Sequence, residues 1–269
     1  MADMFEEYRK QQETTPKKPQ AAQPPIQQAI QDKSPYGITL RTTQGLACEI
    51  LHSDSNAMLR VQLKAGESCK AESGAMVAMS NTIDVEGKLE GGLLGGLGRM
   101  FSGENVFFQT LKANRGAGTV LLSPTMPGDL AIIELEGKTG YLVQKGGFFV
   151  GSQSLNIETT SQSLSKGLFS GEGFFILKAS GKGTLVVSSY GAIHLLDIPA
   201  GEEMIIDNEH LVAWTENANY QVEKAAGGWI SSLTSGEGLV LRFRGPAKVF
   251  IQTRNPSGFK AWIRQSLAK

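Results

Sequence analysis

Short apolar runs alternate with polar residues along most of the chain. Beyond residue 37 these runs are rich in Val, Ile, Leu, Phe and Thr, as in MLRVQL, LAIIEL, TLVVSS and KVFIQT. Gly, Asp, Asn and Pro separate them at intervals of about 8 to 12 residues, which is the spacing of strands in a β-sandwich or barrel. The pattern predicts an all-β body. Only residues 259–269, with Trp262 and Ile263, have helical spacing, and they predict a short C-terminal helix.

The first 36 residues do not follow this pattern. Residues 1–36 contain no glycine but five of the ten prolines, and glutamines fill the stretch PKKPQAAQPPIQQAIQ. Such a segment buries too little apolar surface to offset the entropy that it loses on ordering. We therefore expect a disordered Pro/Gln-rich arm over residues 1–36 and a single all-β domain over residues 37–269.

Three short phrases recur in one order through the domain. The first is a turn followed by an acid, the second is an alternating strand ending in glutamate (IDVE, LNIE and YQVE), and the third is Ser-Gly-Glu. The recurrence predicts tandem duplication of a sandwich unit of about 65 residues. We expect the glycines and acids of the first and third phrases to be the framework of the repeat: Gly66, Glu67, Gly103, Glu104, Gly128, Asp129, Gly171, Glu172, Gly201, Glu202, Gly236 and Glu237.

The phrases divide the domain into three units, over residues 37–88, 89–163 and 164–229, with a closing half-unit over residues 230–255 and a C-terminal tail. The last Ser-Gly-Glu has no turn-and-acid phrase after it, and the first turn-and-acid phrase has no Ser-Gly-Glu before it. We therefore expect the two ends of the chain to complete one another around a pseudo-threefold axis. Such closure would remove the exposed strand edges that invite aggregation.

The recurring carboxylates of Glu104, Glu172 and Glu237 have two interpretations. They would form an acidic site of threefold symmetry, or each would cap its own turn by accepting backbone N–H bonds. We favour turn capping, because catalytic residues tend to be asymmetric whereas a feature of every repeat usually serves the repeat.

One loop combines many glycines with large apolar residues, in GKLEGGLLGGLGRMFSGENVFF. Such a loop would contact another subunit, a protein partner or a membrane surface, and a subunit contact is expected ahead of lipid. The alternative is a crossover that packs against a neighbouring unit. The candidate contact residues are Leu93, Leu94, Leu97, Arg99, Met100 and Phe101.

The charged and reactive residues argue against several function classes. The 26 basic and 26 acidic residues cancel, so no field gathers phosphate backbones, and a nucleic-acid partner is not expected. The histidines His52, His194 and His210 include no pair at metal-ligand spacing, and Cys48 and Cys69 form no CxxC. Neither a P-loop nor a GxSxG elbow occurs. We expect no catalytic, cofactor-binding or metal-binding residues, and two small buried cysteines.

The location follows from what the N-terminal residues lack. No apolar run approaches the roughly 18 residues that span a membrane. Asp3, Glu6 and Glu7 precede Arg9, whereas a mitochondrial presequence is rich in Arg and poor in acids. A cytoplasmic location is expected, with the mitochondrion as the alternative.

Several of these segments together resemble a known family. AGESCKAESGAMVAMS, GGLLGGLGRMFSGENVFFQTLKA, GLFSGEGFFILKASGKGTLVVSSYGAIH and GEEMIIDNEHLVAW are similar to segments of the altered inheritance of mitochondria protein 24 (mitochondrial biogenesis) family, over residues 38–255. The resemblance implies an all-β fold of repeated units related to the tryptophan RNA-binding attenuation protein (TRAP), often assembled as trimers. Mitochondrial members are tied to inner-membrane organisation. The family has no established catalytic residues, so none are carried over.

These observations favour a non-enzymatic, homo-oligomeric scaffold with an unidentified protein partner, and the resemblance implies a trimer. Two alternatives stay open. One is a binder of a small ligand, or a metal-independent enzyme, that uses the pocket of a cupin-like sandwich of the double-stranded β-helix type. The other is RNA binding by analogy to the attenuation protein, which rests on fold alone.

Overall fold

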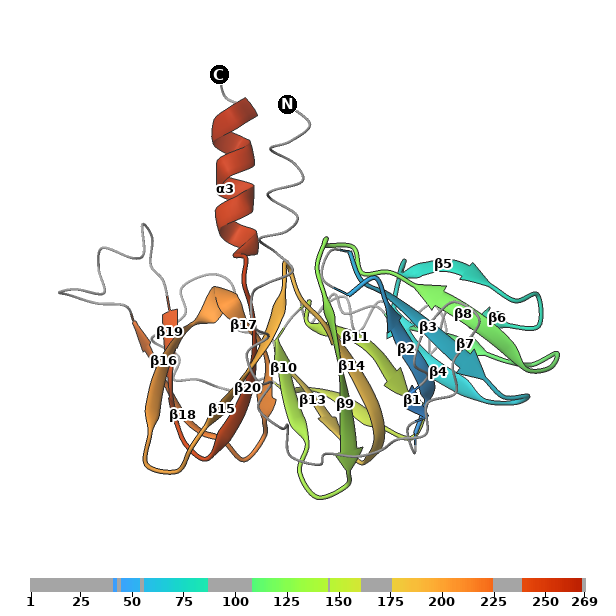
Figure 1. The fold of residues 1–269 in the computed structure, drawn as a ribbon, viewed down its shortest axis with the longest axis horizontal. Helices are drawn as coiled ribbons and strands as arrows, with labels where there is room; N and C mark the ends of the chain where they lie inside the picture. The colour runs from blue at the N-terminus through green and yellow to red at the C-terminus, as the bar shows by residue number, and fades with distance from the viewer. Residues whose placement is uncertain are drawn as a thin grey trace, which may run out of the picture. The chain divides into compact units, whose positions relative to one another are not determined.

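The described part of the chain is rich in β-strands and ends in one α-helix. The computed structural model describes residues 41–42, 45–53, 56–86, 108–144, 146–160, 176–224 and 239–267. The predicted all-β class and C-terminal helix are confirmed (Figure 1), although the helix, α3 (Pro256–Leu267), begins three residues earlier than expected. Pro256 stands at its first position and the Asn255 side chain accepts a hydrogen bond from the Gly258 amide at 2.8 Å, so the sequence caps this helix locally. The expected N-terminal arm lies outside the described residues.

The described strands form four antiparallel sheets. In spatial order the first sheet contains β1 (Arg41–Thr42), β2 (Ala47–Leu51), β3 (Met58–Leu63), β8 (Gly118–Leu122) and β5 (Met76–Met79). The second contains β6 (Asp84–Glu86), β7 (Phe108–Lys112), β4 (Ser68–Glu72), β11 (Phe148–Ser152), β14 (Lys182–Ser188) and β9 (Leu130–Glu136). The third contains β12 (Asn156–Thr160), β13 (Ile176–Ser180), β10 (Tyr141–Gln144), β17 (Leu211–Thr215), β20 (Ala247–Gln252) and β15 (Ile193–Ile198). The fourth contains β16 (Glu203–Asp207), β19 (Leu239–Arg244) and β18 (Asn219–Lys224), and the short 3-10 helix η1 (Asn208–His210) follows β16.

Hydrophobic cores fill the space between successive sheets. The first core joins Leu59 of β3 to Phe149 of β11, and the second joins Leu185 of β14 to Leu177 of β13. In the third core the rings of Trp214 and Phe243 meet edge to face, with centroids 6.0 Å apart. Alternation along the strands produces these faces: in β3 the side chains of Leu59, Val61 and Leu63 are buried, and those between them point outward.

Hydrogen-bonded neighbours group the described strands from β3 onward into three consecutive sets of six: β3–β8, β9–β14 and β15–β20. The strands β1 and β2 precede these sets, and β2 pairs with β3. In each set the sixth strand pairs with the first and the third: β8 with β3 and β5, β14 with β9 and β11, and β20 with β15 and β17. In each set the fifth strand pairs with the second and the fourth: β7 with β4 and β6, β13 with β10 and β12, and β19 with β16 and β18. Two further pairs, β4 with β11 and β10 with β17, join one set to the next. Figure 1 draws the first set in blue to green and the last in orange and red, with the middle set between them.

The strand sets do not begin where the expected units begin. The boundaries at residues 88 and 163 fall inside the first and middle sets, and β19 and β20, which lie in the expected closing half-unit 230–255, pair only with strands of the last set among those described. Strands that are close in sequence pair at a smaller cost in loop-closure entropy than the two ends of the chain would. The recurring phrases do not define where a unit begins, because their cyclic order is the same for every choice of starting point.

Candidate functional site

Many of the residues expected to be functional lie outside the described part of the chain. These are the contact-loop residues Leu93, Leu94, Leu97, Arg99, Met100 and Phe101, and the Ser-Gly-Glu residues Gly103, Glu104, Gly171, Glu172, Gly236 and Glu237.

Gly66 and Gly201 occupy matching turns. Gly66 lies between β3 and β4 with φ of 81°, and Gly201 lies between β15 and β16 with φ of 88°. Residues with a side chain rarely adopt this left-handed conformation, so glycine is the residue that these turns require. The carboxylate of Glu67 accepts a hydrogen bond from the Lys64 backbone amide at 2.8 Å, and the amide of Glu202 donates to the Pro199 carbonyl at 3.2 Å. Both acids therefore follow a tight turn that joins the first two strands of a set.

Gly128 and Asp129 have a different place in the fold from the other two turn-and-acid phrases. They link β8 to β9, which joins one set to the next. The corresponding turn of the middle set, between β9 and β10, contains Gly137 with φ of 86°. Lys138 follows Gly137 instead of an acid, so a search for a glycine followed by an acid passes over it.

Gly128 allows two linkers to cross at close range. It forms an isolated parallel bridge with Gly191, which lies in the linker from β14 to β15. A Cβ atom on Gly128 would overlap the Ser189 carbonyl oxygen and would lie 3.0 Å from the Gly191 nitrogen. The framework role expected for Gly128 is therefore filled by close approach of two backbones rather than by turn geometry.

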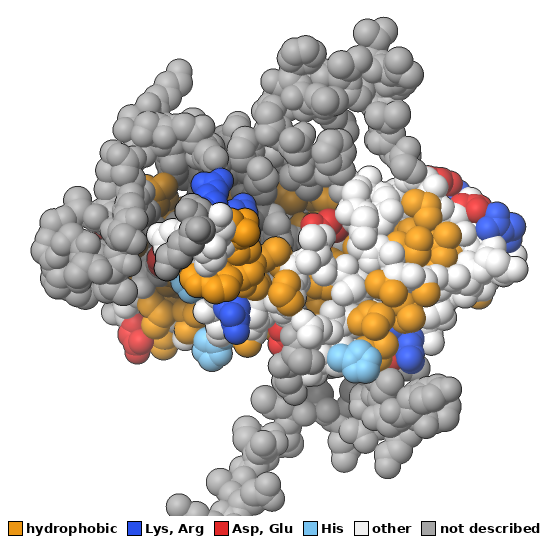
Figure 2. Space-filling view, turned by 90° about the horizontal axis from the view of Figure 1, so that it is seen from above, with side chains coloured by type: hydrophobic (Ala, Val, Ile, Leu, Met, Phe, Trp, Pro, Cys, Tyr) orange, Lys and Arg blue, Asp and Glu red, His pale blue; other side chains and the backbone are white. Residues whose placement is uncertain are grey.

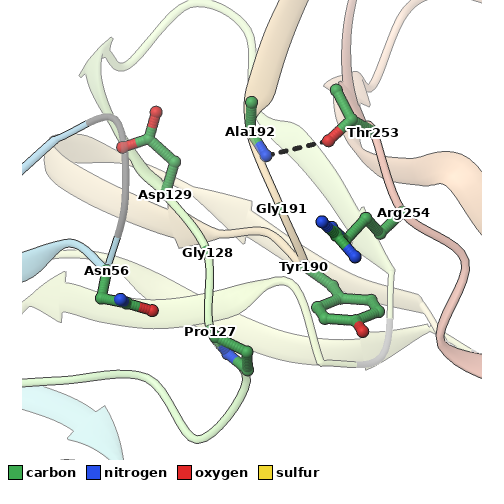
Figure 3. Close-up of a pocket in the computed structure, with 9 residues that line it drawn as sticks. All are labelled: Asn56, Pro127, Gly128, Asp129, Tyr190, Gly191, Ala192, Thr253 and Arg254. Atoms are coloured by element: carbon green, nitrogen blue, oxygen red, sulfur yellow. Dashed lines mark hydrogen bonds between the residues drawn. The ribbon is translucent and has the colours of Figure 1, made fainter. Parts of the chain in front are cut away.

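A cavity of about 460 Å³ lies beside this crossing (Figure 3). The loop between β2 and β3, the two linkers and the residues after β20 all reach it. Its lining residues are Asn56, Pro127, Gly128, Asp129, Tyr190, Gly191, Ala192, Thr253 and Arg254. Because they come from four separate segments, no pattern along the sequence indicated this site.

The cavity wall contains the carboxylate of Asp129 and the guanidinium of Arg254. The Arg254 guanidinium carbon lies 5.9 Å from the centre of the Tyr190 ring, and the Thr253 hydroxyl oxygen accepts a hydrogen bond from the Ala192 amide at 2.9 Å. The carboxylate of Asp129 accepts a hydrogen bond from the amide of Leu130 at 2.8 Å. Across the described ranges, no group of three His, Cys, Asp or Glu residues could hold a metal ion. The wall is suited to binding a small polar molecule through hydrogen bonds and charge.

A second candidate surface is the strand β5, whose apolar side chains are exposed. Met76 and Met79 are each 39% exposed and Val77 is 55% exposed. Figure 2 shows hydrophobic side chains gathered on the side of the molecule where Figure 1 draws β5. β5 pairs only with β8 among the described strands, so its other edge presents unpaired backbone groups.

The third strands of the other two sets are covered instead. β11 lies between β4 and β14, and β17 lies between β10 and β20. Phe149 of β11 and Trp214 of β17 are each 0% exposed. The strand that covers them comes from the preceding set, and β5 has no preceding set.

The two cysteines match the interpretation of small buried hydrophobes, which is confirmed. Cys48 and Cys69 are unpaired and are 1% and 0% exposed. Burial raises the pKa of each thiol to about 12, with smaller contributions from Glu134 at Cys48 and from Cys48 and Glu67 at Cys69. Neither is therefore a thiolate nucleophile at neutral pH.

The family model described as "Mitochondrial biogenesis AIM24" matches residues 48–254. The chain belongs to this family. An uncharacterized protein of Streptococcus pyogenes is 32% identical over 218 residues, which cover 78% of this chain and 86% of that relative. A crystal structure of an S. pyogenes protein has a TM-score of 0.70 and 30% identity, covering 82% of this chain and 99% of that one.

The AIM24 match begins in β2 and ends just before α3, so it includes all three strand sets, the cavity and β5. The resemblance noted from the sequence segments is thus confirmed. In the part of the chain that the structure describes, no helix has the length and apolar character needed to cross a bilayer.

Proposed function

We propose that this AIM24-family chain is a non-enzymatic scaffold that assembles as a homo-oligomer and acts by presenting a rigid β framework to a protein partner. Its body would be three tandem copies of one six-stranded, TRAP-like unit. The identical pairing pattern of β3–β8, β9–β14 and β15–β20 supports the tandem repeat. The two similar joints, β4 with β11 and β10 with β17, support a single operation that relates each unit to the next.

The observation that supports self-association is the exposed apolar strand β5 at one end of the three strand sets. A chain closed around its own pseudo-threefold axis would pair β5 with β16, and the described pairs do not include that one. An exposed, apolar edge strand is an aggregation hazard that natural proteins cover or charge. β5 has the sequence MVAM, without a charge, and all four residues are exposed. We infer that a second copy covers it, and that closure of the series requires more than one chain.

Light scattering on the full chain tests the oligomer. The expected mass is a multiple of the 28.9 kDa chain, and the family resemblance makes the trimer the favoured assembly. Met79→Lys, which adds a charge to β5, should lower the mass. Leu195→Lys is the matched control, because Leu195 is 42% exposed on the distant strand β15 and Met79 is 39% exposed. Both variants should still unfold in one cooperative thermal transition, which shows that each chain has folded. A wild-type chain that is monomeric at micromolar concentration contradicts the scaffold.

The cavity supports a second candidate, a binder of a small polar ligand. Asp129, Thr253 and Arg254 all line it, with Asp129 on one side and Thr253 and Arg254 on the other (Figure 3), and a volume of about 460 Å³ holds a metabolite-sized molecule. A thermal-shift screen of the full chain against metabolites tests this. A stabilising compound should lose its effect in Arg254→Ala and keep it in Arg115→Ala, since Arg115 lies in the turn between β7 and β8 and does not line the cavity.

A further inference from the structure

We propose that β16 of one copy pairs with β5 of a second copy, antiparallel and in the register of the internal joints. Ile206 would face Ala78, Ile205 would face Met79, and Met204 would face Ser80. The inference rests on the proposed self-association and specifies which strands make it. The partner is therefore a second copy of this chain, joined head to tail.

The internal joints show what such a contact looks like. In the first joint Ala71 of β4 faces Val150 of β11, and Lys70 faces Gly151. In the second joint Val143 of β10 faces Ala213 of β17, and Leu142 faces Trp214. Each joint pairs the second strand of one set with the third strand of the next. β16 is the second strand of the last set and β5 is the third strand of the first set, so these are the two strands of this kind that lack such a partner among the described strands.

The third strands align without ambiguity, because each carries the same irregularity. Pairing with the sixth strand shifts register between Met76 and Ala78 in β5, between Phe148 and Val150 in β11, and between Leu211 and Ala213 in β17. A bulge of this kind is a marker of position in a sheet. Ala78 therefore corresponds to Val150 and Ala213.

The second strands align through the strands before them. Leu63, Leu135 and Ile198 each pair with the sixth strand of their own set, opposite Gly118, Gly183 and Ala247. The positions eight residues further along are Ala71, Val143 and Ile206. Ala71 and Val143 are the residues that face Val150 and Ala213 in the internal joints. Ile206 is therefore the residue that would face Ala78.

The exposure of the two edges fits the missing contact. Val150, Ala213 and Trp214 are each 0% exposed in the internal joints. The position that corresponds to Trp214 is Met79, which is 39% exposed, and Met204 at the edge of β16 is 38% exposed. Both edges thus present apolar side chains where the internal joints bury them, and the joint between copies would remove both from water.

A contact of this kind uses different surfaces on its two sides. Each copy has one β16 and one β5, so the same joint adds copy after copy. It forms a ring where the rotation between copies closes, and a filament where it does not. The measured mass decides between these two forms, and the joint is the same in both.

Disulfide trapping between two different chains tests the register. Met79→Cys and Ile205→Cys would be made separately in the full chain, one of them with a size tag, then mixed, oxidised and separated without reductant. A pair of directly opposite residues on neighbouring strands has the Cα separation that a disulfide needs. Cys48 and Cys69 stay in place, because they are buried and their thiols have raised pKa values. The expected product is a covalent dimer of one tagged and one untagged chain.

The control moves one cysteine by a single position. Met204→Cys mixed with Met79→Cys places the two thiols on opposite faces of the joint, because side chains alternate along a strand. Met204 and Met79 are 38% and 39% exposed, whereas Ile205 is half-buried and therefore less accessible. Random collision between chains would thus favour disulfide formation in the control pair. We expect at least about 10-fold more dimer from Met79→Cys with Ile205→Cys than from the control pair.

The outcomes separate this inference from the proposed function. An oligomeric wild type with equal or no trapping in the two mixtures overturns the β16–β5 joint and leaves the scaffold standing. A monomeric wild type overturns both. A Met79→Cys/Ile205→Cys double variant that traps only within one chain also overturns the joint between copies. Melting temperatures within a few degrees of wild type show that each variant has folded.

Discussion

The crossing of the two linkers at Gly128 makes a sharp prediction about stability. A Cβ atom at this position would overlap the Ser189 carbonyl oxygen and would lie 2.8 Å from the Ser189 carbonyl carbon, where 3.4–4 Å is ordinary contact. All of these neighbours are backbone atoms, so no flexible side-chain end can move aside. Gly128→Ala must therefore separate the two linkers.

The cost can be worked out from the hydrogen bonds that hold the crossing. The Gly191 amide donates to the Pro127 carbonyl at 3.1 Å, the Ser189 amide donates to the Asp129 carbonyl at 3.0 Å, and the Ala57 amide donates to the Gly128 carbonyl at 2.9 Å. Each such bond contributes about 0.5–1.5 kcal/mol, so the loss of all three costs about 1.5–4.5 kcal/mol. For a domain of this size that lowers the melting temperature by roughly 3–18 °C.

Gly66→Ala is the matched control for this substitution. No atom lies within 4 Å of the Cβ position at Gly66, but its φ of 81° strains any side chain. This strain alone costs about 1 kcal/mol. Thermal unfolding followed by circular dichroism, with urea unfolding for the free energies, would compare the two variants. If Gly128→Ala loses no more stability than Gly66→Ala, then the close crossing does not contribute as argued.

Two further predictions concern titrating groups. Cys48 and Cys69 should not react with a thiol reagent in the folded protein at pH 8, because burial raises each pKa to about 12, and both should react in denaturant; rapid labelling of the native chain would contradict this. The pKa of Glu216 lies below its usual 4.5, because the Lys178 ammonium is 2.8 Å away and, to a smaller extent, because the Gly140 amide donates a hydrogen bond to the carboxylate. The ionised carboxylate therefore stabilises the folded state above about pH 4.5, and this stabilisation is lost as the pH falls through the lowered pKa. Glu216→Gln should therefore lower the melting temperature by a few degrees at pH 7 and by less at pH 3; an equal loss at both pH values would show that the charge is not responsible.

Local features of this protein were readable from the sequence. Alternation of apolar and polar residues indicated strands such as β3, because one face of the strand packs on a core and the other does not. The turns at Gly66 and Gly201 were recognisable because their left-handed backbone conformation requires glycine at one position. The burial of both cysteines was expected because they form no CxxC pair. Each of these conclusions depends on a few consecutive residues.

Pairing between distant strands was not readable in this way. The recurring phrases have the same cyclic order wherever the unit begins, so the expected boundaries fell inside the strand sets. The same search placed Gly128 with two turns that it does not match, since its glycine serves a crossing with Gly191 rather than a turn. The cavity could not be predicted from the sequence, because its lining residues come from four segments that only the fold brings together.

The contrast between β5 and β17 shows why the burial of a strand could not be predicted from its own residues. MVAM in β5 and LVAW in β17 are both short and apolar, and both form the third strand of their set. Yet every residue of β5 is exposed, whereas those four residues of β17 are buried. Burial of this strand depends on a neighbour from another set, β10 in the case of β17. The sequence by itself determined that both segments are short and apolar, and only the tertiary structure decided which of the two strands has an edge left open.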